Sequence, residues 1–430
     1  MPVFALISNA PYRKSVKEIT LPKKTNLENL LKDLKDFEKS HIFNGTIAAA
    51  LGDHMIYAKS FGNADFESNT PCTMDTQYNV ASVTKQFTAA ALLRVLYDAN
   101  PSVDILQKAL QTSLSHYLPS EDFIWDGMMP EWAQRTTLHH LLTHTSGIVN
   151  YTELDCFWNH LYLLENPSMV DLVRLFKGKP LNFDPGTQYN YSNSGYVLLG
   201  QVIERLSKKT LSQYFLKTFF TPLNMVNTAL PTQGTTLSLK KSKSFFHLAR
   251  GYTYDLTHPL GPYSELKHYW PHPIDAGDGG IISTAPDLIK WNNALHKGHV
   301  LPLDVLKLML TPYILIPGEL NAFYGYGIVC RKSGIGNIFT HGGAIPGYLT
   351  YPIYILSLDV TIVSLSNISF DNSCLKAIKE ELSHREDTIE KKAKYDEIFN
   401  TRYPQAQEII EKHSLFKTND LKTLNAGFAN

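Results

Sequence analysis

The chain has 430 residues, of which 43% are hydrophobic and 19% charged, so it is long enough for one large core or two closely packed domains. Its 40 Lys and Arg balance its 40 Asp and Glu, and the lack of a basic excess argues against nucleic acid or an anionic membrane as partner. No stretch approaches the roughly 20 consecutive apolar residues that span a bilayer, so we expect no membrane span.

The first residues, MPVFALISNAPYRKS, form a short apolar run with no basic residue before it and no small-residue cleavage pattern. This is a poor secretory signal, which predicts a cytoplasmic location, with export by a route that needs no N-terminal signal as the alternative. The four cysteines lie far apart and form no C-x-x-C pair, so we expect neither a disulfide framework nor a zinc site but free, mostly buried thiols: Cys72, Cys156, Cys330 and Cys374.

The first predicted elements are a helix and a β-hairpin. Residues 25–39 carry apolar side chains at helical spacing behind a Thr25–Glu28 capping box. The segments GTIAAAL and HMIYAKSFG follow on either side of a Gly52-Asp53 turn, which predicts two antiparallel strands.

Helices dominate the middle of the chain, and strands return near its end. The alanine- and leucine-rich segment after Ser82 predicts a helix, and residues 100–260 read as mainly helical with long loops. The segments IFTH, YLTYPIYIL and VTIVSLS within residues 338–366 predict strands, with Leu358-Asp359 as a turn.

This order predicts an α+β fold: an antiparallel sheet built from the N- and C-terminal segments and flanked by helices, with an all-helical domain inserted between them. We expect residues 1–80 and 270–382 to form the sheet domain and residues 81–269 the mostly helical domain. Residues 383–430 are charged and predict a C-terminal helical extension.

The segment ASVTKQFTAAALLRVL places Ser82 three residues before Lys85 at the start of the predicted helix. Serine is a favoured N-cap residue, so a structural role is one interpretation. The other is a nucleophile, because residues i and i+3 share a helix face and a lysine with a lowered pKa takes a hydroxyl proton. The S-x-x-K spacing is common by chance, since it recurs at Ser238, Ser264, Ser373 and Ser414.

Tyr191-Ser192-Asn193 is the only Y-x-N in the chain. A phenol near an ammonium shuttles protons to a leaving group, and an asparagine side chain both donates to and accepts from a substrate amide. Taken alone, the motif is better explained as a buried tyrosine and a loop-capping asparagine.

A third segment, IFTHGGAIPGYLTYPIYIL, leads from a strand into His341-Gly342-Gly343. Glycines in a strand mark a place where another backbone or a ligand comes close. The N–H group of Ala344, just beyond them, is a candidate oxyanion donor. The alternative is a β-bulge with an incidental histidine.

Together these segments resemble the serine β-lactamase-like family, which includes class C β-lactamases, D,D-peptidases, D-aminopeptidases and related esterases. Ser82-Val-Thr-Lys85 resembles its S-x-x-K, Tyr191-Ser192-Asn193 its Y-x-N, and His341-Gly342-Gly343 its K/H-x-G motif. The resemblance covers roughly residues 40–382 and extends to flanking segments at 137–148, 183–200, 221–228 and 279–288.

The resemblance implies catalytic roles for Ser82 as the acylated nucleophile, Lys85 as its proton acceptor or electrostatic activator, and Tyr191 as the acid/base. It implies substrate binding by five further residues: Asn193, His341, Gly342, Gly343 and Ala344. The N–H groups of Ser82 and Ala344 would form the oxyanion hole. His341 would shape the electric field of the site and the hydrogen bonding of Tyr191. It leaves open whether Lys85 or Tyr191 is the general base. No cofactor is implied.

His341 stands where class C β-lactamases have lysine, and a neutral histidine attracts a substrate carboxylate poorly. We therefore expect a serine hydrolase acting on a small ester, amide or short peptide. The alternatives are a D,D-carboxypeptidase or β-lactamase, and, from a different class, a non-catalytic binding or scaffold protein on the same fold. The oligomeric state is not predicted.

His140 and His144 lie four residues apart, which raises a metal pair as an alternative. No glutamate follows His140 as in H-E-x-x-H, so we expect no metal site. Tyr324 and Tyr326 in YGYG read as packing residues or as part of a pocket lining.

Overall fold

The computed structural model describes residues 43–159, 168–231, 247–254, 264–265, 276–319 and 321–370, together with Glu28 and Leu34. The chain divides into two compact units, Met1–His41 and Ile42–Asn430. Glu28 and Leu34 are both helical. The rest of the helix predicted over 25–39, and the extension predicted over 383–430, lie outside the described residues.

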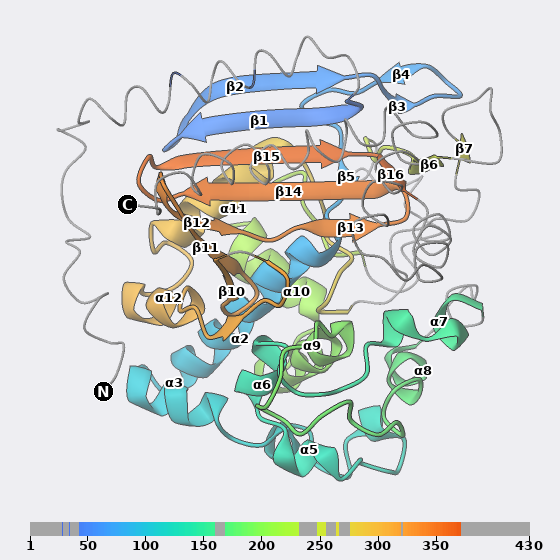
Figure 1. Cartoon of the computed structure of the whole chain (residues 1–430), viewed down its shortest axis with the longest axis vertical. Helices are drawn as coiled ribbons and strands as arrows, with labels where there is room; N and C mark the ends of the chain where they lie inside the picture. Colours follow the sequence, from blue (N-terminus) through green and yellow to red (C-terminus); the bar gives the residue numbers. More distant parts are fainter. Residues whose placement is uncertain are drawn as a thin grey trace, which may run out of the picture. The chain divides into compact units, whose positions relative to one another are not determined.

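The larger unit contains a nine-stranded antiparallel sheet with the order β2-β1-β15-β14-β12-β11-β10-β9, to which β13 is joined by pairing with β14 (Figure 1). The strand order brings the two ends of the described chain together, because β1 pairs with β15 in register from Gly45↔Ser366 to Leu51↔Val360. The strands of this sheet are β1 (Gly45–Leu51), β2 (His54–Phe61), β9 (Ile314–Leu315), β10 (Ala322–Tyr324), β11 (Val329–Ser333), β12 (Gly336–Thr340), β13 (Gly343–Ile345), β14 (Tyr348–Ile355) and β15 (Val360–Ser366).

The predicted hairpins are confirmed. Gly52 and Asp53 connect β1 to β2, and Gly52 adopts the positive φ of 54° that such a turn favours. Asp359 ends the β14–β15 turn with φ 52°. Smaller pairings complete the strands: β3 (Asn63–Asp65) with β4 (Thr70–Pro71), β5 (Tyr78–Asn79) with β8 (Ile282–Ser283), and β6 (Tyr252–Tyr254) between β7 (Ser264–Glu265) and β16 (Ile368–Phe370).

Helices fill most of the described chain between the N-terminal and C-terminal strands, as the sequence predicted. They are α2 (Thr84–Ala99), α3 (Val103–Leu110), α4 (Leu114–Tyr117), α5 (Trp132–Arg135), α6 (Leu138–Leu142), α7 (Asp155–Asn159), α8 (Met169–Arg174), α9 (Asn193–Ser207), α10 (Leu211–Phe215), α11 (Ala285–His296) and α12 (Leu303–Met309). Short 3-10 turns are η2 (Ala81–Val83), η3 (Phe123–Trp125) and η4 (Tyr151–Glu153), and η6 (Leu216–Phe220) is π-helical. The domain boundaries at 81, 269 and 383 stay predictions.

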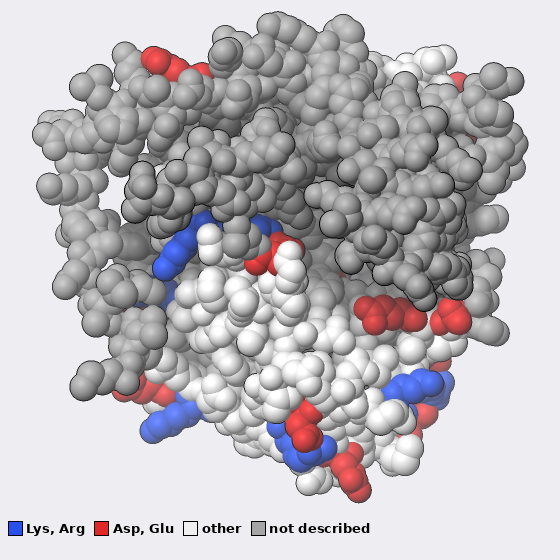
Figure 2. Space-filling view, in the orientation of Figure 1, with Lys and Arg blue, Asp and Glu red and all other residues white. Residues whose placement is uncertain are grey.

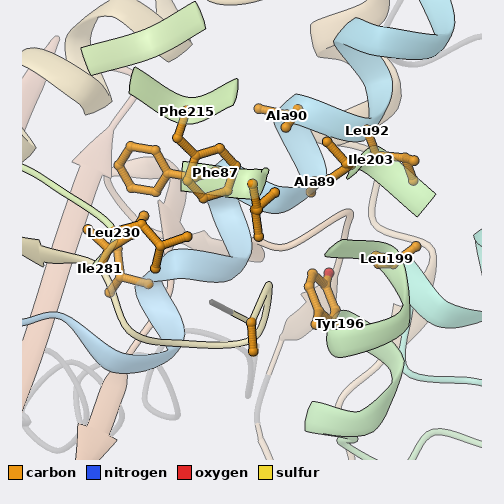
Figure 3. Packing of buried hydrophobic residues seen from close by; sticks show 14 of the residues in the cluster. Phe87, Ala89, Ala90, Leu92, Tyr196, Leu199, Ile203, Phe215, Leu230 and Ile281 are labelled. Atoms are coloured by element: carbon orange, nitrogen blue, oxygen red, sulfur yellow. The ribbon is translucent and has the colours of Figure 1, made fainter. Parts of the chain in front are cut away.

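Helix α2 lies at the centre of the core. Every residue from Thr84 to Leu93 is buried, which is the pattern of a helix surrounded by protein rather than one with a single apolar face. Phe87 stacks on Trp291 of α11 with ring centroids 3.7 Å apart, and α9 packs along the same helix (Figure 3). Helix α11 in turn packs against β1 and β15, so the start of α2 is held between the sheet and the helices.

On the face in Figure 2, the coloured acidic and basic side chains form small separate groups, several of them mixed, and no large field of one sign is visible. Within the part of the chain that the structure describes, no helix has the length and apolar content needed to cross a membrane. The described cysteines Cys72, Cys156 and Cys330 are free, as predicted; Cys374 lies outside the described residues.

Candidate active site

Ser82 lies in the 3-10 turn η2 that leads into α2, and its side chain is partly exposed. Neither η2 nor α2 has a side-chain N-cap bond, so the capping interpretation of Ser82 fails. Its hydroxyl instead accepts a hydrogen bond from Lys85 Nζ at 3.1 Å. The residue before it, Ala81, has a left-handed φ of 47° and donates its N–H to Asn79 Oδ1 at 2.8 Å. Such backbone strain persists only where surrounding contacts hold it.

Lys85 is fully buried, and its ammonium makes three short contacts. Nζ donates to Ser82 Oγ at 3.1 Å, to Asn193 Oδ1 at 2.6 Å and to the main-chain oxygen of Asp278 at 2.7 Å. Burial lowers the pKa of Lys85 from 10.5 to about 7, against the opposing attraction of the Asp278 carboxylate. Lys85 therefore exchanges its proton near neutral pH.

The three contacts also decide where a neutral Lys85 points its lone pair. A neutral amine has two N–H donors and one acceptor site, whereas a carbonyl oxygen only accepts. The Asn193 amide is fixed with its oxygen toward Lys85, because Nδ2 donates to Asn150 Oδ1 at 3.2 Å and to Thr152 Oγ1 at 3.1 Å. Of the three partners, only the Ser82 hydroxyl is able to donate. A neutral Lys85 thus faces the proton that a nucleophilic serine must lose.

Tyr191 lies over the same group. Lys85 Nζ is 4.9 Å from the centre of its ring. Although the side chain keeps partial exposure, the protein around its hydroxyl desolvates it and raises the pKa of Tyr191 well above 10. Tyr191 is therefore a neutral phenol near neutral pH.

His341 occupies the break between β12 and β13, where it is buried and uncharged. Its Nδ1 lies 2.8 Å from the Gly342 carbonyl oxygen, and its Nε2 lies 2.7 Å from the Tyr324 hydroxyl. Since the carbonyl only accepts, Nδ1 carries the proton and Nε2 accepts from Tyr324. Burial lowers the pKa of His341 to about 3. His341 thus bonds Tyr324 and not Tyr191, whose ring centre lies 6.3 Å from the ring centre of His341.

Gly343 explains how the third motif reaches the serine. A Cβ added to Gly343 would lie 2.2 Å from the Val80 carbonyl oxygen, so only glycine lets β13 come this close to the segment before Ser82. Strand β13 packs on η2, and Gly342 and Ala344 are exposed on either side of Gly343. The strand is paired with β14 through Gly343↔Thr350 and Ala344↔Leu349.

Other buried groups complete the site without having been singled out from the sequence. The Asp278 carboxylate accepts from Tyr151 Oη at 2.7 Å. Asn150 Oδ1 orients Asn193 by accepting from both the main-chain N–H and the side-chain Nδ2 of Asn193. The sequence signal for Asp278 was the acidic residue inside the glycine-rich GDGG at 277–280, directly before the flanking segment at 279–288.

The two histidines considered as a metal pair have separate roles. His140 closes the capping box of α6, its Nδ1 accepting from the Thr137 N–H. His144 accepts from the Ser192 N–H at 3.1 Å, and its ring lies 4.2 Å from that of Tyr191. Among the described residues, no group of three or more His, Cys, Asp or Glu side chains is placed to hold a metal ion.

The family model described as Beta-lactamase matches residues 27–379. The chain belongs to the β-lactamase family. Its sequence is 29% identical over 369 residues to penicillin-binding protein 4* of Bacillus subtilis (strain 168), covering 84% of this chain and 76% of that protein. It is 25% identical over 306 residues to D-aminopeptidase of Brucella anthropi, covering 71% of this chain and 52% of that one.

Solved structures of this family share the fold. The penicillin-binding protein from Bacillus halodurans superimposes with a TM-score of 0.65 at 26% identity, covering 81% of this chain and 98% of that one. The D-amino acid amidase from Ochrobactrum anthropi SV3, complexed with L-phenylalanine amide, gives a TM-score of 0.62 at 22% identity, covering 80% and 92%. The predicted family and the α+β fold are confirmed, although the chain spans only about half the length of the D-aminopeptidase.

Proposed function

We propose that this protein is a serine hydrolase that forms an acyl-enzyme on Ser82 and acts on small esters, amides or short peptides. The observation that carries the proposal is the buried Lys85, whose Nζ touches the Ser82 hydroxyl at 3.1 Å and whose pKa of about 7 lets it take a proton near neutral pH. A binding or scaffold protein has no need of a desolvated lysine against a partly exposed serine, because burying that charge costs stability.

In the proposed reaction Ser82 Oγ attacks the substrate carbonyl carbon while its proton passes to Lys85 Nζ. The oxyanion that forms accepts hydrogen bonds from the N–H groups of Ser82 and Ala344, an arrangement that contributes a few kcal/mol in such enzymes. When the intermediate collapses, Tyr191 gives its proton to the leaving group and regains one from Lys85. Water then gives a proton to the neutral Lys85 by way of Tyr191 and attacks the acyl carbon; the bond to Ser82 Oγ breaks, and Ser82 Oγ takes that proton from Lys85.

The substrate class follows from the charges around Ser82. The neutral His341, held by Gly342 and Tyr324, offers no permanent cation for a substrate carboxylate. Among the relatives, D-aminopeptidase and D-amino acid amidase carry names of amide hydrolases. We therefore favour esters and uncharged amides over carboxylate-terminated peptides or penicillins as substrates. The proposal also keeps the cytoplasmic location predicted from the sequence.

The test is the intact mass of the protein after incubation with a fluorophosphonate or with a penicillin, with Ser82→Ala in parallel. We expect one fluorophosphonate adduct on the wild type and none on the variant. An additional penicillin adduct would move the substrate toward D-alanyl-D-alanine-like amides. No adduct on folded wild-type protein would refute the hydrolase and leave ligand binding as the function.

A further inference from the structure

Asp278 differs from the other buried aspartates of the described chain. Asp122 and Asp287 each form an ion pair with a basic side chain, at 2.5 and 2.8 Å respectively. Asp278, only 5% exposed, forms no such pair with any described residue. One carboxylate oxygen accepts from Tyr151 Oη at 2.7 Å, and the other is buried with no hydrogen-bond partner in the described part of the chain. A carboxylate kept out of water in this way needs a nearby cation to offset the loss of hydration.

The chain holds this carboxylate beside Lys85 by a close backbone approach. Gly277 lies against α9, where a Cβ added to it would be 2.5 Å from the Tyr196 carbonyl oxygen and 3.2 Å from Gly200 Cα. Its own carbonyl oxygen accepts from Thr88 Oγ1 of α2 at 2.6 Å. The next carbonyl along, that of Asp278, accepts from Lys85 Nζ. The main chain therefore fixes residue 278 against the lysine, and the Asp278 carboxylate acts on the charge of Lys85 by raising its pKa.

The other groups that face Lys85 carry no charge near neutral pH. Burial raises the pKa of the phenols of Tyr191 and Tyr196. It lowers the pKa of the imidazoles of His144 and His341, and the charge of Lys85 lowers these two further. Among the described residues, Asp278 is thus the side chain whose coulombic interaction raises the pKa of Lys85. Tyr151, which holds the carboxylate, contacts it from η4.

We propose that Asp278 is a positioning residue which, held by Tyr151, stabilises the ammonium form of Lys85 and so sets the lower pH limit at which Ser82 is activated. Its catalytic consequence rests on the proposed function. The carboxylate touches neither Ser82 nor the substrate in this scheme. It acts through Lys85, by stabilising the positive charge that Lys85 acquires when the Ser82 proton arrives, and the price is a lower fraction of neutral lysine at acidic pH.

The protonation of Lys85 is measured directly by NMR titration of the full chain labelled with [ε-13C]lysine. The Lys85 signal is the one missing from Lys85→Met. Asp278→Asn is expected to lower its midpoint by about one pH unit, the effect of losing one nearby opposite charge. Asp278→Ala, measured in parallel, is expected to lower the Lys85 midpoint as well. Asp278→Glu, which keeps the carboxylate, is expected to have the wild-type midpoint. A midpoint unchanged in both neutral variants would overturn the proposal.

The consequence for Ser82 is read from the rate of fluorophosphonate labelling at pH 6 and pH 8.5. In the wild type about a tenth of Lys85 is neutral at pH 6, against about half in Asp278→Asn. The labelling rate at pH 6 divided by the rate at pH 8.5 therefore rises about fivefold in the variant. A general loss of structure slows labelling at both pH values and leaves the ratio unchanged, which would also count against Asp278.

Asp287→Asn is the matched control, because Asp287 is equally buried but paired with Lys290. It is expected to leave both the Lys85 midpoint and the labelling ratio as they are in the wild type. The NMR titration requires no reactive probe. If folded wild-type protein is not labelled at all, the hydrolase proposal fails, while the NMR midpoint still decides the role of Asp278.

Discussion

Replacing Lys85 by methionine removes the charge while keeping a long apolar side chain, and it changes how stability depends on pH. Burial lowers the pKa of Lys85 from 10.5 to about 7 in the folded chain. Between these two values the unfolded chain holds the proton and the folded chain does not. The unfolded state thus binds more protons, and the free energy of unfolding of the wild type rises with pH across this window.

The size of the effect follows from the two pKa values. Each pH unit in which only the unfolded lysine is protonated adds about 1.4 kcal/mol to the free energy of unfolding. Folded Lys85 is about half protonated at pH 7 and nearly neutral at pH 9. Its contribution therefore rises by about 2 kcal/mol between pH 7 and pH 9.

The assay is urea denaturation of the wild type and Lys85→Met at pH 7, 8 and 9. The other titrating groups are common to both proteins, so the difference between the two free energies of unfolding isolates Lys85. We expect this difference to shift by about 2 kcal/mol in favour of the wild type as the pH rises. A difference that stays constant over this range would refute a lysine with a lowered pKa, and with it the assignment of Lys85 as the base.

Two further substitutions test the geometry around the serine. Gly343→Ala places a Cβ against a main-chain oxygen 2.2 Å away and is expected to cost about 1–3 kcal/mol in the free energy of unfolding; Gly334→Ala, where a Cβ meets no atom within 4 Å, is expected to be nearly neutral by the same chemical denaturation. Equal effects at the two glycines would contradict the close approach of β13 to the segment before turn η2. Tyr191→Phe is expected to slow turnover of an activated ester by at least about 100-fold while leaving the fold intact, because it removes the proton donor. Tyr189→Phe is its control, and equal rates in the two phenylalanine variants would exclude Tyr191 as the acid that serves Ser82.

The sequence alone determined the local elements and the three motifs. The Gly52-Asp53 turn between two apolar segments predicted the β1–β2 hairpin, and Leu358-Asp359 predicted the β14–β15 turn, because turn chemistry and side-chain alternation act over a few residues. The order of strands, helices and strands predicted a sheet assembled from both ends of the chain, which the pairing of β1 with β15 bears out.

The tertiary structure decided what the motif residues contact. Sequence spacing allows Ser82 to be a cap or a nucleophile, and the choice depended on Lys85 being buried against its hydroxyl. The family resemblance implied that His341 shapes the hydrogen bonding of Tyr191, whereas in the folded chain His341 bonds Tyr324.

Asp278 was out of reach of sequence reasoning, because it lies 193 residues from Lys85 along the chain. Their meeting depends on the close approach of Gly277 to α9 and its bond from Thr88 of α2. Periodicity and turn signals report which face of an element is buried. They do not report which distant backbone packs against that face, and the protonation of a buried lysine depends on that neighbour.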